Sequence, residues 1–290
     1  MSAPLRMLVL EDSPRLGQEN MAIDERLLNG LGARDLDWLV AEDALQRDRL
    51  REWLSASDGP LLAVRFYSWA EPTLSLGHFQ RIEQLGQAED TREHPSLRAL
   101  AWVQRKTGGG AILHDRELTY SIIVPSGTEP LASSKGHSEL LYRAVHQEVV
   151  EGLRALGLDA KLSESCTCSP KAATKSNEPF LCFHRRTPVD VVLGGDQGHQ
   201  DHKVLGSAQR RVKTGLLQHG SFLIEKSMAY RSLLGVEDLG GRATPMGGVF
   251  EGKSDWEDWF QQRIFSAIGG LLGLPEDGFR LNLRERSVRI

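Results

Sequence analysis

The chain has 290 residues, of which 40% are hydrophobic and 26% charged, and its formal net charge is −4 at pH 7. This composition is typical of a soluble globular protein, and it excludes a largely disordered chain and a strongly basic nucleic-acid-binding protein. The first apolar run, MLVLED, is too short and too closely flanked by charges for a signal peptide, and no segment reaches membrane-spanning length. We therefore expect a cytoplasmic protein that binds neither nucleic acid nor membrane.

The hydrophobic pattern predicts helices first and strands after them. Helical spacing of apolar residues predicts a helix at 19–31, and one or two amphipathic helices follow within 35–54. Strands are predicted where β-branched and aromatic residues gather between Gly and Pro residues: two within 59–80, joined by a turn at 70–72, and two more at 97–105 and 117–125.

The second half of the chain opens with the clearest helix, at 138–158. A polar loop follows, and the next elements are a hairpin of 188–195 with 202–209, a strand at 215–225 and a helix at 254–272. Hairpins outnumber strand-helix-strand units, which favours an antiparallel or mixed sheet. The pattern predicts one α+β domain over 1–290, with a mixed, mostly antiparallel central sheet and flanking helices.

A glycine-rich loop, QRKTGGGAILHD, lies between two of the predicted strands. Gly108, Gly109 and Gly110 have no Cβ atoms, so their amide groups can approach a carbonyl, phosphate or thioester closely. The loop matches neither a phosphate-binding loop that ends in Gly-Lys-Ser/Thr nor the dinucleotide fingerprint. A simple hairpin turn without a ligand remains the other interpretation.

Two further segments carry reactive side chains. Lys203 precedes a predicted Gly206-Ser207 turn, where it can stabilise an anion or thiolate or remain a solvated lysine. Cys182 lies in EPFLCFHRR, where it is either an inert core residue or a nucleophile. Cys166, Cys168, Cys182 and His184 do not have the usual zinc spacing, and His199 and His202 fall on a hairpin tip, so we expect no metal site.

Several motifs together resemble one family. NMAIDERLL (20–28), PTLSLGHFQ (72–80), RKTGGGAILHDRELTYSIIVP (105–125), LCF (181–183) and KVLGSAQRR with LLQHGSFLI (203–224) occur in the order seen in the biotin/lipoate A/B protein ligase family. The resemblance covers about 18–234. A Cys-Phe pair upstream of Lys-x-x-Gly-Ser-Ala-Gln is similar to its octanoyltransferase branch of the LipM type. It implies a class II synthetase-like fold, with a catalytic core at about 59–240 and the C-terminal helix 254–272.

The resemblance also implies an activity. In that branch a cysteine takes an octanoyl group from acyl carrier protein as a thioester and passes it to a lysine of a lipoyl domain, such as the glycine cleavage H protein, without a cofactor. Cys182 corresponds to this nucleophile and Lys203 to the lysine that stabilises its thiolate. The implied substrate-binding residues are Arg105, Thr107, Gly108, Gly109, Gly110, His114, Gly206, Ser207, His219 and Gly220.

Basic residues near the two motifs are expected to form a rim that steers acidic carriers: Arg185, Arg186, Arg210, Arg211 and Lys213. The chain departs from the family pattern in longer segments near 30–57 and 194–202. It also has Gly110 where this branch often has arginine, a feature shared with the ATP-dependent lipoate ligases. Such a ligase, an amidotransferase between lipoyl domains, and a non-catalytic carrier-binding module stay open as alternatives.

Overall fold

The computed structural model describes residues 3–87, 95–132, 137–163, 179–194, 201–240, 253–275 and 278–283. Cys166, Cys168 and His199, for which the sequence predicts no metal site, lie outside these residues. Within the described ranges, no helix is both long and apolar enough to cross a membrane. The same ranges contain no group of three or more His, Cys, Asp or Glu side chains placed to hold a metal ion.

The main sheet has eight strands in the order β11-β1-β2-β6-β10-β9-β8-β7. The strands are β1 (Arg6–Asp12), β2 (Leu61–Tyr67), β6 (Glu117–Pro125), β7 (Ala160–Leu162), β8 (Val191–Leu193), β9 (His202–Arg211), β10 (Gly215–Leu223) and β11 (Phe279–Leu283). β1 pairs in parallel with β2 and β11, and the remaining neighbours are antiparallel. The prediction of an α+β fold with a mixed, mostly antiparallel sheet is confirmed.

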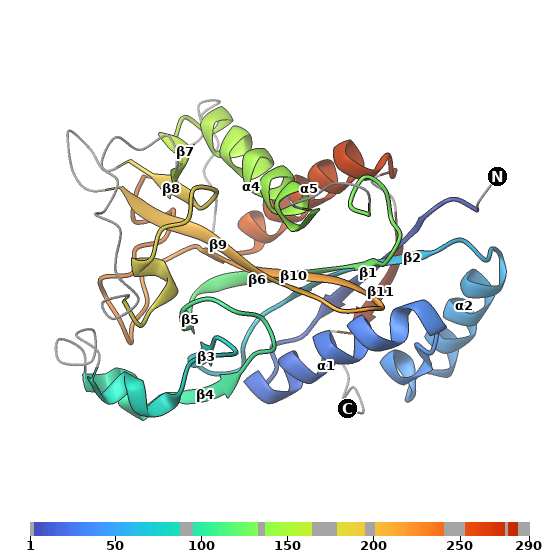
Figure 1. The fold of residues 1–290 in the computed structure, drawn as a ribbon, viewed down its shortest axis with the longest axis horizontal. Coiled ribbons are helices and arrows are strands. Elements are labelled where there is room, and N and C mark those ends of the chain that lie inside the picture. Colours follow the sequence, from blue (N-terminus) through green and yellow to red (C-terminus); the bar gives the residue numbers. More distant parts are fainter. Residues whose placement is uncertain are drawn as a thin grey trace.

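A small second sheet carries the glycine-rich segment. It consists of β3 (Thr73–Leu76) between β4 (Ala101–Gln104) and β5 (Ile112–His114). The two strands predicted within 59–80 are β2 and β3, and they belong to different sheets. The glycine loop joins β4 to β5, next to one end of the first helix in Figure 1.

Helices cover both faces of the main sheet, as Figure 1 shows. α4 (His137–Ala155) and α5 (Lys253–Leu272) pack side by side on one face, and α1 (Gly17–Gly30) and α2 (Ala44–Ser55) lie on the other. The Asp43 side chain caps α2 by accepting a hydrogen bond from the amide of Gln46. The short helical turns are η1 (Leu31–Ala33), η2 (Asp37–Val40), η3 (Ile82–Gln87), η4 (Pro95–Ala99) and η6 (Cys182–His184).

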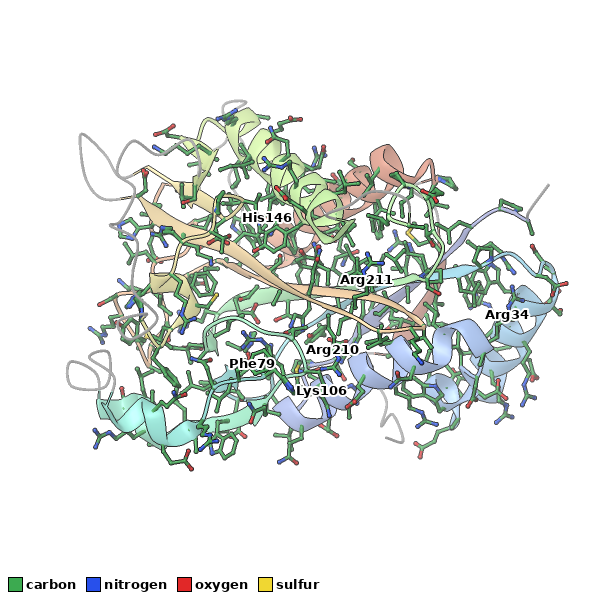
Figure 2. All side chains as sticks on the ribbon, in the orientation of Figure 1. Arg34, Phe79, Lys106, His146, Arg210 and Arg211 are labelled. Carbon is green, nitrogen blue, oxygen red and sulfur yellow. The ribbon has the colours of Figure 1, made fainter. Side chains whose placement is uncertain are left out.

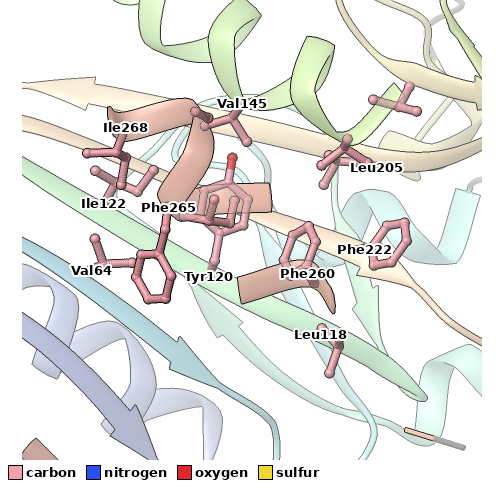
Figure 3. Close-up of a cluster of buried hydrophobic side chains, with 14 of the residues drawn as sticks. Val64, Leu118, Tyr120, Ile122, Val145, Leu205, Phe222, Phe260, Phe265 and Ile268 are labelled. Atoms are coloured by element: carbon pink, nitrogen blue, oxygen red, sulfur yellow. The ribbon is translucent and has the colours of Figure 1, made fainter. Parts of the chain in front are cut away.

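The core explains why the central strands are apolar throughout their length. Successive side chains of a strand point to opposite faces, so Ile122 packs toward α4 and α5 while Ile123 packs toward α1. Trp256, Phe260 and Ile264 of α5 lie four residues apart and form one buried stripe. Figure 3 shows Phe260 with Tyr120 and Phe222 of the sheet in this cluster. Polar groups that remain buried in such strands therefore need specific partners.

Candidate functional site

Cys182 lies beside the glycine loop because the two segments form a short parallel bridge. The amide of Cys182 donates to the carbonyl of Ala111 over 2.6 Å, and the amide of Ala111 donates to the carbonyl of Phe180 over 2.9 Å. A Cβ atom at Gly110 would lie only 3.0 Å from both N and Cα of Cys182. The glycine at position 110 therefore permits the close approach of the half-buried cysteine.

Lys203 of β9 points at the sulfur of Cys182. Its Nζ lies 3.5 Å from the Cys182 Sγ and 2.8 Å from Oδ2 of Asp190, which directly precedes β8. Val191 pairs with Leu205 while Val192 pairs with Lys203, so Val204 is the extra residue of a β-bulge. Bulges change the direction of neighbouring side chains, and this one lies next to the candidate catalytic lysine.

The neighbouring glycine of β9 leaves room for this lysine. A Cβ at Gly206 would lie 2.5 Å from Cε of Lys203, so it would displace the end of the lysine side chain from this position. Gly206 and Ser207 lie within β9, paired with Ser221 and Gly220 of β10. The predicted Gly206-Ser207 turn is therefore wrong: these residues continue the strand.

The charge balance around Lys203 keeps it protonated. Burial alone lowers the pKa of Lys203, but the negative charges of Cys182 and Asp190 outweigh burial, so the pKa is raised above the ordinary value. Oδ2 of Asp190 also accepts a hydrogen bond from the Thr187 amide over 2.7 Å, which fixes the carboxylate. An ammonium held near a sulfur stabilises a thiolate and needs no metal to do so. This cluster can therefore support nucleophilic chemistry at Cys182.

Arg105 organises the glycine loop from within. Its side chain is buried and donates to the carbonyls of Gly108 and Gly110 over 2.8 and 2.6 Å, and to the hydroxyl of Thr107 over 3.1 Å. Burial lowers the pKa of Arg105 to about 10, although the charge of Cys182 acts in the opposite direction. The guanidinium thus remains charged at neutral pH and holds the loop in shape.

Thr107 and His219 meet in a second cluster. Thr107 Oγ1 lies 2.6 Å from His219 Nε2, and His219 Nδ1 lies 3.7 Å from Asp24 Oδ2 on α1. Burial lowers the pKa of His219 more strongly than Asp24 raises it. Asp24 is itself paired with the buried Arg65 over 2.9 Å. These contacts anchor the glycine loop to the sheet and to α1.

His114, the other predicted histidine contact, is enclosed by side chains of both sheets. Its Nε2 lies 2.8 Å from the Ser75 hydroxyl, and its ring stacks on Trp69 with centroids 3.8 Å apart. Among the described residues its buried Nδ1 has no hydrogen-bond partner, and it lies 3.4 Å from an oxygen of Glu117. The Arg105 guanidinium donates hydrogen bonds to the carbonyl and hydroxyl oxygens of Ser75. His114 is therefore linked to the glycine loop through that serine.

Ser207, Gly220 and Tyr120 form a row across β9, β10 and β6. A Cβ at Gly220 would lie 2.4 Å from the Ser207 Oγ and 2.5 Å from a ring carbon of Tyr120. The absent side chain lets the Tyr120 hydroxyl come within 2.7 Å of the Ser207 hydroxyl. Gly220 is therefore needed for this cross-strand contact, and Ser207 is engaged within the sheet.

His146 completes this row, and the sequence analysis missed it. Its Nδ1 lies 2.6 Å from the carbonyl oxygen of Val189 and its Nε2 lies 2.7 Å from the Ser207 hydroxyl. A carbonyl only accepts, so Nδ1 carries the proton and Nε2 accepts from Ser207. Burial lowers the pKa of His146 to about 4, which keeps the ring neutral. Figure 2 shows His146 at α4, over the main sheet.

The predicted residues thus fall into linked groups. Cys182 and Lys203 are in contact, and Gly110 and Gly206 lie next to them. The other predicted residues belong to the clusters described above, which centre on Arg105, His219, His114 and Ser207. Asp190 and His146 are additions that the structure makes. Asp190 stands in PVDVV, where an acidic residue next to a run of valines is a sign of a buried, paired carboxylate.

The expected basic rim divides into two parts. Arg185 and Arg186 turn toward the backbone: Arg185 donates to the carbonyl of Pro179 over 2.6 Å and Arg186 to that of Phe183 over 2.8 Å. The Arg185 Nε also lies 2.7 Å from the position of a Cβ at Gly110. A guanidinium therefore stands next to position 110 although this residue is glycine. Arg210, Arg211 and Lys213 remain on the β9–β10 hairpin.

Comparison with known proteins assigns the chain to a family. Residues 17–239 match the family model described as the lipoyl protein ligase A/B catalytic domain. The chain belongs to this family. The matched residues include α1, whose Asp24 contacts His219.

Curated relatives of this family member include octanoyltransferases. The chain is 40% identical over 178 residues to octanoyltransferase LipM of Geobacillus kaustophilus, covering 61% of this chain and 59% of the relative. It is 32% identical over 204 residues to octanoyltransferase LipM of Staphylococcus aureus, covering 70% of this chain and 60% of the relative. The chain thus spans about three fifths of the length of the curated relatives that it matches.

Solved structures that are similar to the chain include lipoate ligases. A bi-partite lipoate protein ligase from Thermoplasma acidophilum is similar with a TM-score of 0.52 and 19% identity, covering 96% of this chain and 87% of the other. Lipoate-protein ligase A bound with ATP gives a TM-score of 0.53 and 18% identity, covering 96% and 90%. At this low sequence identity, the structural similarity shows that the chain shares the fold of these ligases and nothing further.

Proposed function

We propose that this family member is a protein octanoyltransferase that works through a thioester on Cys182. It takes an octanoyl group from octanoyl acyl carrier protein and transfers it to a lysine amine of a lipoyl domain, such as the glycine cleavage H protein. The observation that carries the proposal is the buried Lys203 ammonium, 3.5 Å from the Cys182 sulfur. The octanoyltransferases among the relatives support it.

The reaction proceeds in two acyl transfers that share one sulfur. The Cys182 thiolate attacks the carbonyl carbon of the donor thioester, and the carbon–sulfur bond to the carrier breaks as the new thioester forms. The departing carrier thiolate takes a proton from Lys203. In the second transfer a neutral lysine amine of the acceptor attacks the Cys182 thioester, an amide forms, and Cys182 leaves as the thiolate while Lys203 recovers a proton from the amine.

The position of the cysteine favours a transferase over a ligase. An ATP-dependent lipoate ligase activates a free acid as an adenylate, and that chemistry has no use for a thiol next to a buried ammonium. An amidotransferase between lipoyl domains would use the same Cys182 and Lys203 and would differ only in its donor. No cofactor is required for either thioester exchange, and we infer that the enzyme acts in the cytoplasm, where its thiol stays reduced.

One experiment separates these activities. The protein is incubated with octanoyl acyl carrier protein without ATP, denatured and examined by mass spectrometry. We expect one octanoyl group on Cys182, labile to hydroxylamine, and none in the Cys182→Ser variant. ATP-dependent transfer of free octanoate or lipoate without a covalent species would instead identify a ligase, and acylation by an octanoylated lipoyl domain alone would identify an amidotransferase.

A further inference from the structure

A rigid surface loop presents an exposed aromatic side chain next to the candidate site. Phe79 is 86% exposed and lies between β3 and η3. Single exposed apolar residues are ordinary on protein surfaces. Phe79 differs from them because its loop is held in place by several hydrogen bonds and is connected to both the glycine loop and the Cys182 segment.

The hydrogen bonds leave the backbone of this loop little freedom. The Gln104 side-chain amide lies within hydrogen-bond distance of the carbonyls of Gly77, His78 and Gln80, at 3.0, 3.0 and 2.9 Å. A Cβ at Gly77 would lie 1.9 Å from the carbonyl oxygen of Gly109, so the two loops are in direct backbone contact. Such a preorganised loop loses little conformational entropy when a partner binds it.

The same loop is hydrogen-bonded to the two segments that form the candidate site. The amide of His78 donates to the Thr107 carbonyl over 2.8 Å, and the side chain of Gln80 donates to the Phe180 carbonyl over 3.0 Å. Phe180 lies two residues before Cys182. A molecule that packs on Phe79 therefore contacts a loop that is hydrogen-bonded to both the glycine loop and the segment that carries Cys182.

Cationic side chains lie near this position. Lys106 follows Arg105 on the glycine loop, and its carbonyl accepts a hydrogen bond from Arg210 over 2.9 Å. The side chains of Arg81 and Arg210 form no ion pair with any described residue. The Lys106 ammonium lies 3.4 Å from a carboxylate oxygen of Glu25, and the lysine side chain is about half exposed. Phe79, Lys106 and Arg210 lie in one region of Figure 2, between the small sheet and α1. Arg81 and Arg210 thus leave positive charge near this apolar side chain that no described carboxylate pairs, although the protein as a whole is net acidic.

We propose that Phe79, with Arg81, Lys106 and Arg210, forms the docking surface for the acidic carrier domain that delivers the acyl group. The proposal rests on the proposed function. An acyl donor carries its thioester on a long flexible arm, so its domain can dock beside Cys182 rather than on it. An acceptor lysine has a shorter reach and must bring its domain closer to the sulfur. Apolar anchors ringed by charge are typical of binding hot spots.

The test measures binding and chemistry separately. Carrier protein loaded with octanoate through a stable amide is titrated against the wild type, Phe79→Ala and the control Leu45→Ala, which removes a 72%-exposed side chain on α2. We expect Kd to rise at least tenfold for Phe79→Ala and to stay unchanged for Leu45→Ala. Arg210→Glu should weaken binding and flatten its salt dependence.

Acylation of Cys182 is then followed with two donors. With octanoyl carrier protein, Phe79→Ala should lower kcat/KM about tenfold, and with octanoyl-N-acetylcysteamine it should match the wild type. Unchanged carrier affinity, or an equal loss with both donors, would overturn the docking surface. A loss confined to transfer from the acylated enzyme to the lipoyl domain would also overturn it, because the surface would then serve the acceptor. Carrier binding without acylation in the wild type would instead contradict the proposed function alone.

Discussion

Asp190 and Lys203 form an ion pair that is almost completely removed from solvent. Their charged atoms lie 2.8 Å apart, and the side chains are 0% and 2% exposed. The remaining carboxylate oxygen, Oδ1, lies 3.2 Å from the Tyr142 hydroxyl. Burying two charges is unfavourable unless each has its partner. The pair therefore couples the fold of this region to the position of the ammonium next to Cys182.

Removing the carboxylate should destabilise the protein. In Asp190→Asn the Lys203 ammonium loses its counter-ion while it stays buried, and we expect the free energy of unfolding to fall by about 3 kcal/mol. The pKa of Lys203 should also fall, because Cys182 then remains as the single negative charge of the two that raise it. Chemical denaturation at pH 7 measures the first effect.

A double variant provides the control for this prediction. Replacing both partners, as in Asp190→Asn with Lys203→Met, leaves no unpaired charge, so part of the lost stability should return. If the double variant is less stable than Asp190→Asn by the full cost of Lys203→Met alone, the two residues are not energetically coupled and the interpretation is wrong.

Lys203 should control the reactivity of Cys182. In Lys203→Ala the positive charge 3.5 Å from the sulfur is lost, and we expect alkylation by iodoacetamide at neutral pH to slow about tenfold. Lys106→Ala is the matched control, since that lysine is exposed and lies next to Glu25. Superimposable alkylation rates for Lys203→Ala and the wild type would show that the lysine does not stabilise the thiolate.

Two glycines of the same loop should respond differently to a methyl group. A Cβ at Gly110 would lie 3.0 Å from the backbone of Cys182, whereas one at Gly108 would meet nothing within 4 Å. Gly110→Ala should therefore displace Cys182, lower stability by about 1 to 3 kcal/mol and reduce the rate of acylation. Gly108→Ala should leave stability unchanged. Equal unfolding midpoints for the two variants would mean that the loop relaxes around the added atom.

The sequence predicted the elements whose pattern is local. The helix at 138–158 and the strand at 215–225 correspond to α4, His137–Ala155, and β10, Gly215–Leu223, because each has a sustained periodicity. It missed β1, Arg6–Asp12, whose apolar run was considered only as a targeting segment. It also missed β11, Phe279–Leu283, which pairs in parallel with β1 across more than 260 residues of chain. Pairing at that separation leaves no local pattern.

The candidate site, like the fold, was predicted from the sequence only in part. Motif order brought Cys182 and Lys203 into one hypothesis, and the structure places them in contact. The interpretation of Gly206-Ser207 as a turn was wrong, because a glycine that makes room for Lys203 in a strand looks the same in sequence as a turn glycine. His146 was missed because a histidine on the apolar face of a helix does not show what its ring contacts.

His146 makes stability depend on pH in a predictable direction. Its pKa is lowered to about 4 by burial, against an ordinary value of 6.5, so between these values the unfolded chain binds a proton that the native protein does not. Stability from this group is therefore complete above pH 6.5 and is lost as the pH falls toward 4, by up to about 3 kcal/mol. In His146→Asn, whose amide can still donate to the Val189 carbonyl, this loss is absent. We expect the stability difference between wild type and variant, measured by denaturation from pH 7.5 to 4.5, to shrink steadily below pH 6.5. Because His114 and His219 are present in both proteins, their contributions cancel in the comparison, and a difference that is constant over this range would show that His146 is not held neutral in the folded protein.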